Sequence, residues 1–173
     1  TSLRKDVEVS DIRGESVHVE LAPAFGTLRV VTLPAGCTVY VDGLPKGKTV
    51  RNPDTDRTRS LPLDITGVKS GAHQVRIAHP NGGERTKSAV VKAGETTTAV
   101  LQMWVIDTKV ELTDGTVKYG MLLSHDEEHG DLTLAEPKPT QYLGEQIRKI
   151  GEVTPDEARE IRAERGLDEE EAE

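Results

Sequence analysis

The chain has 173 residues, a net charge of -8 and few aromatic side chains, namely one Phe, one Trp and three Tyr. This leaves few stacking platforms for nucleic-acid bases or sugars. Residues 25–105 hold 11 basic and 6 acidic side chains, whereas residues 106–173 hold 8 basic and 19 acidic ones. Because each phosphate contact needs a cation, the acidic half argues against nucleic-acid binding, and the basic half has no run of Lys or Arg.

The sequence contains no stretch of about 18 apolar residues and no recognisable signal peptide, so no transmembrane helix is expected in it. It begins with Thr1-Ser2 rather than Met, from which we expect a processed or trimmed chain. The single cysteine, Cys37, has no partner for an internal disulfide and lies in an apolar pattern. We expect it to be a small buried side chain.

Alternation of apolar and polar residues predicts a β-hairpin at the N-terminus, with short strands at residues 7–9 and 17–21 and a turn at 11–15. A hairpin without a neighbouring sheet exposes unpaired edge groups, so we expect this one to pack on the next domain or to pair with another chain. The candidate interaction residues in it are Val7, Val9, Val17 and Val19.

An internal repeat is indicated by the Gly-Glu pairs at 14–15 and 94–95, each of which separates two short strand patterns. We therefore interpret residues 1–24 as the end of a preceding repeat, whose full copy is residues 26–102.

The middle of the chain, residues 25–104, is predicted to be a small β-domain. Asp42-Gly43 is a hairpin turn signal, and residues 44–60 are turn-rich and hydrophilic. Residues 61–65 are expected at a sheet edge, because Pro62 cannot donate to a central ladder. Further strands are expected at 27–33, 38–41, 74–78, 88–91 and 96–103.

A second β pattern covers residues 105–152, and residues 153–173 are predicted to be a capped helix with an acidic tail. The helix signal is Thr154-Pro155-Asp156-Glu157, a capping box with Pro at the first helical position, and Gly166 is the expected stop. The predicted fold class is therefore all-β: a small antiparallel β-sandwich, a small β-barrel-like unit and a short C-terminal helix. Strands of the second unit are expected at 109–112, 117–123, 131–134 and 147–150.

Residues 26–102 resemble the PEGA family, a small β-domain often repeated in exported bacterial proteins. The resemblance is carried by Gly26-Thr-Leu-Arg-Val, Pro34-Ala-Gly36-Cys37, Val39-Tyr-Val-Asp42-Gly43, Gly47, Gly71-Ala-His73 and the segment from Val90 to Leu101. The sequence departs from the family where Ala35 and Cys37 replace the Glu and Ala of the Pro-Glu-Gly-Ala motif. The resemblance implies a periplasmic or cell-surface location and a binding or spacer role, and it does not imply catalysis. We expect no cofactor.

Residues 105–151 resemble, less specifically, the strand pattern of a small Sm-like barrel. The matching features are Val110-Glu-Leu112, Asp114-Gly115, Tyr119-Gly120, Asp131-Leu-Thr-Leu134, Ile147 and Ile150. RNA binding does not carry over, because the segment is acidic and poor in aromatic residues.

The sharpest chemical motif is His125-Asp-Glu-Glu128-His129, which has the spacing of inverted zinc peptidases. That chemistry needs a helix that puts both His on one face, whereas this motif lies between two predicted strands. We expect a polar hairpin loop and no metal site, with His125 and His129 as weak candidate ligands.

Two loops resemble ligand-binding motifs in part. Asp54-Thr-Asp56 has too few acidic ligands for Ca²⁺, and residues 43–49 end in Gly-Lys-Thr but are one residue short of a phosphate loop, with no helix pattern after them. We expect both to be ordinary solvated segments.

The sequence thus predicts a non-enzymatic binding or assembly module of a bacterial cell-envelope protein, acting through protein partners or self-association by β-edge pairing. Trp104 is expected to pack between the two β units and is the fifth candidate interaction residue. One alternative is a carbohydrate-binding module for cell-wall glycan, with Trp104, Tyr40 and Tyr142 as contacts. Another is a metal-dependent hydrolase at His125, Glu128 and His129.

Overall fold

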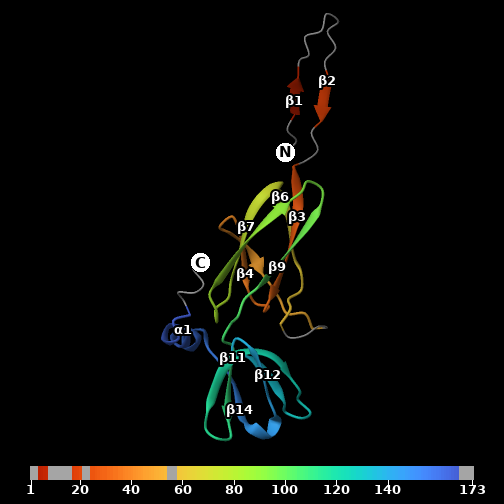
Figure 1. Cartoon of the computed structure of the whole chain (residues 1–173). Coiled ribbons are helices and arrows are strands. Elements are labelled where there is room, and N and C mark those ends of the chain that lie inside the picture. The colour runs from red at the N-terminus through yellow and green to blue at the C-terminus, as the bar shows by residue number, and fades with distance from the viewer. Residues whose placement is uncertain (1–3, 8–16, 21–23, 54–57, 168–173) are drawn as a thin grey trace, which may run out of the picture.

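The structure is a computed structural model that describes residues 4–7, 17–20, 24–53 and 58–167. Most of these residues lie in antiparallel strands, and one α-helix follows them (Figure 1). The bounds in chain order are β1 Arg4–Val7, β2 Val17–Glu20, β3 Phe25–Leu33, β4 Thr38–Val41, β5 Leu44–Lys48, β6 Leu63–Lys69, β7 Gly71–Ala78, β8 Glu84–Val91, β9 Thr96–Gln102, β10 Thr108–Leu112, β11 Val117–His125, β12 Leu132–Ala135, β13 Pro139–Tyr142, the 3-10 turn η1 Gly144–Gln146, β14 Ile147–Glu152 and α1 Pro155–Glu164. The predicted all-β class with a C-terminal helix is confirmed.

The strands β3 to β9 form a sandwich of two sheets, with strand orders β6-β3-β9 and β5-β4-β7-β8. Its core consists of the alternate, inward-facing residues that the sequence pattern marks, such as Leu28, Val39, Val75 and Ile77, all of them fully buried. Cys37 is also fully buried in this cluster, as expected for a thiol that acts as a small apolar group.

The pairing of the first and last strands of the sandwich differs from the antiparallel arrangement expected for this unit. β3 and β9 run parallel over seven residue pairs, from Thr27 opposite Thr96 to Leu33 opposite Gln102. Every other strand pair described in the sandwich is antiparallel. The chain leaves the sheet of β3 after β6, forms β7 and β8 in the other sheet, and returns with β9 on the opposite side of β3 from β6.

Two edge strands were missed in the sequence pattern. β5 lies in the segment expected to be a loop, and all five of its residues are exposed. β13 was likewise not expected, and three of its four residues are exposed. A strand without a buried face has no alternation to reveal it. By contrast, the expected edge position of the segment after Pro62 is confirmed, because β6 is the outer strand of its sheet.

The second unit is a five-stranded sheet with the order β13-β12-β11-β10-β14. β10 to β13 follow one another as neighbours, and β14 returns to pair with β10. Within the described residues the sheet ends at β13 on one side and at β14 on the other, so the expected barrel-like unit is an open sheet. Its core is a cluster of Val110, Leu132, Leu134 and Tyr142.

The helix α1 begins where the capping signal predicts. The Thr154 hydroxyl accepts a hydrogen bond from the Glu157 N–H at 3.3 Å, and Pro155 opens the first turn. Ala158 and Ile161 pack against Ile106 and Val153. The helix therefore covers the segments that connect the two β units, beside the green and blue strands in Figure 1.

The two described strands of the N-terminal hairpin pair with each other, from Arg4 opposite Glu20 to Val7 opposite Val17. They form a two-stranded sheet of their own and join neither sheet of the sandwich. In Figure 1 they lie beyond the end of the sandwich that is opposite to the five-stranded sheet.

Candidate functional site

The junction between the sandwich and the five-stranded sheet is held by Asn81, in the turn between β7 and β8. Its side-chain amide donates to the carbonyl oxygens of Ile106, at 3.0 Å, and of Val153, at 2.6 Å. The main-chain carbonyl oxygen of Asn81 accepts a hydrogen bond from the Ile106 N–H at 3.0 Å. The Asn81 side chain is buried, so these bonds fix the turn rigidly against the second unit.

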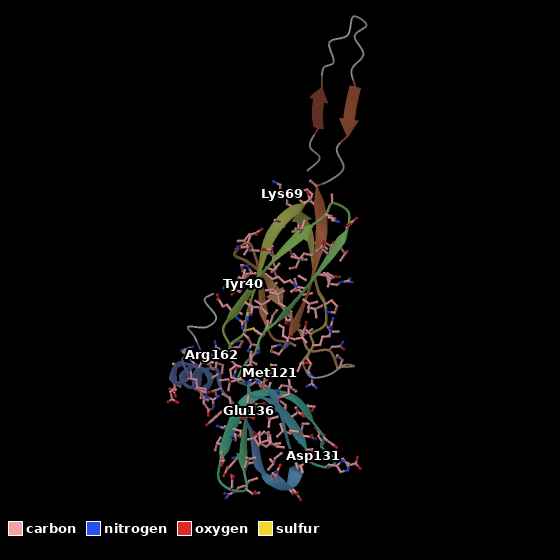
Figure 2. All side chains as sticks on the ribbon, in the orientation of Figure 1. Tyr40, Lys69, Met121, Asp131, Glu136 and Arg162 are labelled. Atoms are coloured by element: carbon pink, nitrogen blue, oxygen red, sulfur yellow. The ribbon has the colours of Figure 1, made fainter. Side chains whose placement is uncertain are left out.

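Trp104 lies at the same junction, as predicted. Its indole N–H donates to the Ala135 carbonyl oxygen at 2.6 Å. The ring is partly buried and packs both on the sandwich core and on the cluster beneath α1. Met121, labelled in Figure 2, also reaches from the second unit into the sandwich core. The two units therefore share apolar contacts as well as hydrogen bonds.

A groove of about 500 Å³ lies beside this junction. Arg51 and Asn81 line it from the sandwich, and the remaining lining residues come from the second unit: Asp107, Thr108, Leu122, His125, Ile150, Gly151, Glu152 and Val153. A groove of this size between two units is in the range of ligand sites, which makes it the main candidate site in the described part of the chain.

Asp107 is a partly buried acid in this groove. Its Oδ1 accepts hydrogen bonds from the Thr108 hydroxyl, at 2.8 Å, and from the Leu122 N–H, at 3.0 Å. Burial nevertheless raises the pKa of the Asp107 carboxyl above its ordinary value, because desolvation outweighs these two bonds. No pattern in the sequence singled out Asp107 or Asn81, since each is one polar residue near a strand end.

The His125 to His129 motif lies in a hairpin loop, as expected, and not on a helix. His125 ends β11, and the residues after it form a turn. Asp126 organises this turn, because its carboxylate accepts from the N–H groups of Glu128 and His129 and pairs with the His129 ring at 2.7 Å. His129 is thus engaged by Asp126, and no group of three or more metal-ligating side chains is found among the described residues.

The remaining motifs are placed as follows. Asp54 and Asp56 lie outside the described residues. Residues 44–48 of the Gly-Lys-Thr segment form the strand β5, not a phosphate-binding loop. Burial raises the pKa of the Cys37 thiol to about 11, so it is a neutral core group at physiological pH.

The three aromatic residues of the carbohydrate alternative do not share one exposed face. The Tyr40 ring is covered by the Arg76 guanidinium, whose carbon lies 3.9 Å from the ring centroid. Tyr142 is buried in the other unit, and its hydroxyl donates to Glu136, at 2.6 Å. Figure 2 shows Tyr40 and Glu136 in different units. Trp104 is the only one of the three at the junction.

Of the four valines predicted as interaction residues, Val9 lies outside the described residues. In the β1–β2 ladder, Val7 is opposite Val17, and Val19 is opposite Lys5.

The free edges of the five-stranded sheet differ in character: β13 begins with Pro139, whereas the six residues of β14 include no Pro. A proline lowers the capacity of an edge to accept another strand, so β14 is the more receptive edge.

Comparison with known proteins gives one match. The family model of the PEGA domain matches residues 25–103, which confirms the resemblance of this segment and coincides with the sandwich β3 to β9. Searches of curated proteins and of solved structures found no significant match. None of the helices described here has the length and apolar character needed to cross a bilayer.

Proposed function

We propose that the PEGA domain at residues 25–103 makes this chain a non-catalytic binding and assembly part of a bacterial cell-envelope protein, which associates with further copies by pairing of strand edges. PEGA domains are binding modules of extracellular or periplasmic proteins and are generally not catalytic, so the family match supports the binding role and the location. The self-association rests on the arrangement of the strands.

The observation that carries the proposal is the separate hairpin β1–β2. It forms a two-stranded sheet that no strand of the described sheets extends. A two-stranded hairpin is only marginally stable alone in water, and a third strand would satisfy one row of its unpaired N–H and C=O groups. The hairpin is therefore suited to donate its edge to another chain.

The acceptor that suits this hairpin best is the free edge of β14 in a neighbouring copy. The hairpin and the five-stranded sheet lie at opposite ends of the molecule in Figure 1, so this contact joins copies head to tail. The charge of the two larger units supports the same alignment, because it brings the sandwich of one copy (residues 25–105, net charge +5) next to the acidic unit of the following copy (residues 106–173, net charge -11), whereas residues 1–24 carry -2. A head-to-tail contact that does not close into a ring gives a filament.

Sedimentation velocity of the full chain over a wide range of concentrations tests the proposal. We expect association that rises with concentration and weakens with salt. Val19→Pro, which removes an N–H from β2, should reduce the association, whereas the control Val19→Thr should retain it, because Thr keeps the N–H and favours strands. A chain that stays monomeric at every concentration contradicts the proposal.

A further inference from the structure

The apolar face of the five-stranded sheet is incompletely covered where it borders the junction groove. Ile150 lies directly opposite Val110, and Leu122 lies directly opposite Leu134. Residues directly opposite each other point to the same face of a sheet. Val110 and Leu134 are fully buried in the core of the sheet, yet Ile150 remains 37% exposed. The groove therefore has an apolar wall, formed by Ile150 and Leu122, that this chain leaves open to solvent.

The polar end of the groove is acidic. Asp107 and Glu152 both line it, and Glu152 lies opposite Thr108, the residue that follows Asp107. The other charged or titratable groups of the lining are Arg51, which is exposed, and His125. Within the part of the chain that the structure describes, Asp107 forms hydrogen bonds but no ion pair.

The electrostatics of Asp107 favour a cationic ligand. Burial disfavours its charged form, and neutral donors compensate only in part, as the raised pKa of this carboxyl indicates. A cation placed in the groove would stabilise the carboxylate and form a charge-assisted hydrogen bond, which is stronger than a bond from a neutral donor. The carboxyl is thus suited to a cationic partner, since no ion pair to it forms among the described residues.

We propose that the junction groove binds a lysine or arginine side chain from an extended segment of a protein partner. The aliphatic stem lies on Ile150 and Leu122, and the cationic head reaches Asp107. Lys and Arg combine an apolar stem with a charged tip. The stem matches the apolar wall of the groove, and the tip matches its acidic end. The volume of about 500 Å³ also suits one long side chain with its flanking backbone.

This site shares Ile150 and Glu152 with β14, the strand proposed to receive β1–β2, but it uses their side chains. It uses the face of the sheet and the groove beneath Asn81, whereas the edge pairing uses main-chain groups of the outer strand. A failure of one proposal therefore leaves the other standing, and the two are read by different measurements, ligand titration and sedimentation.

The test is a titration of the full chain with N-acetyl-arginine methylamide, followed by NMR of the Leu and Ile methyl groups. We expect saturable shifts at Leu122 and Ile150. The matched probe N-acetyl-norleucine methylamide has an apolar side chain without the charge. We expect its affinity to be at least about tenfold lower, because it lacks roughly one charged hydrogen bond.

Asp107→Asn should lower the affinity for the arginine probe by a similar factor of about ten, because the substitution removes the charge and keeps the shape of the side chain. The control Asp156→Asn, on the exposed first turn of α1, should bind as the unaltered chain does. The comparison of the two probes needs no variant, so it remains decisive if Asp107→Asn does not fold. Equal binding of both probes, shifts outside the groove, or no saturable shift at millimolar probe overturns the proposal.

Discussion

The side-chain amide of Asn81 lies 2.6 Å from the main-chain carbonyl oxygen of Val153 and joins the turn after β7 to the segment that leads into α1. These residues are 72 positions apart in the chain. One polar side chain thus bridges the sandwich and the second unit at the place where their apolar surfaces meet.

The first prediction concerns this bridge. Asn81→Ala leaves the carbonyl groups of Ile106 and Val153 without their side-chain donor in a buried site. We expect the free energy of unfolding to fall by about 3 kcal/mol, since each buried unpaired group costs roughly 1–3 kcal/mol. Urea denaturation followed by Trp104 fluorescence measures it. A loss below about 0.5 kcal/mol, as for an ordinary surface change, would show that the bridge is dispensable.

The second prediction concerns pH. The two ring nitrogens of His73 face the Asp42 carboxylate and the Lys69 carbonyl oxygen, so both must donate and the ring is favoured as imidazolium. The hydrogen bond to Asp42 is the main cause that raises the pKa of His73 above its ordinary value. A raised folded-state pKa adds stability that is fully present below about pH 6.5 and is lost as the pH rises through the folded-state pKa.

Chemical denaturation at pH 5.5 and pH 8.5 checks this effect. The unaltered chain should be more stable than His73→Gln at the lower pH, and the difference between them should shrink at the higher pH. Asp42→Asn should shift the NMR titration of His73 back toward the ordinary value. A stability difference that grows with pH has the wrong sign and contradicts the assignment.

The third prediction concerns Cys37. The thiol is fully buried, and burial raises its pKa to about 11, so only about one molecule in a thousand carries a thiolate at pH 8. An aromatic disulfide reagent should not label the folded chain over hours and should label it promptly in urea. Rapid labelling without denaturant would indicate that the sandwich core opens locally.

The fourth prediction concerns the N-cap of α1. Thr154→Ala removes the hydroxyl that accepts from the Glu157 N–H and should lower the free energy of unfolding by about 1 kcal/mol. Thr154→Ser keeps the hydroxyl and should be close to neutral. Because α1 packs beside Trp104 and Ile106, the Ala variant should also change the fluorescence of the folded state. Equal stability of the two variants would contradict the capping role.

Much of the sandwich follows from local pattern. Residues such as Val39 and Val75 alternate with polar neighbours because one face of each strand is buried, and the cap at Thr154 is equally local. β5 escaped prediction because its Lys46 and Lys48 mark an exposed edge that has no periodic burial. The parallel pairing of β3 with β9 depends on the route of the whole chain, which no short window of sequence contains.

The candidate groove could not be predicted from the sequence, for a related reason. Asn81, Asp107 and Ile150 come from a turn, a linker and an edge strand, and only the docking of two units brings them together. Each is unremarkable alone, because a polar residue near a strand end is ordinarily solvated. The His125 motif, by contrast, attracted attention by its spacing, but the backbone around it is a turn organised by Asp126.

The parallel ladder between β3 and β9 has a mechanical consequence. The chain enters the sandwich at one end, at Phe25, and leaves it at the other, at Gln102, so a pull on the two ends runs along both strands. Such a pull loads the hydrogen bonds of all seven residue pairs in shear, and they must give way together instead of unzipping one by one. A chain of such sandwiches in series would transmit tension along its length.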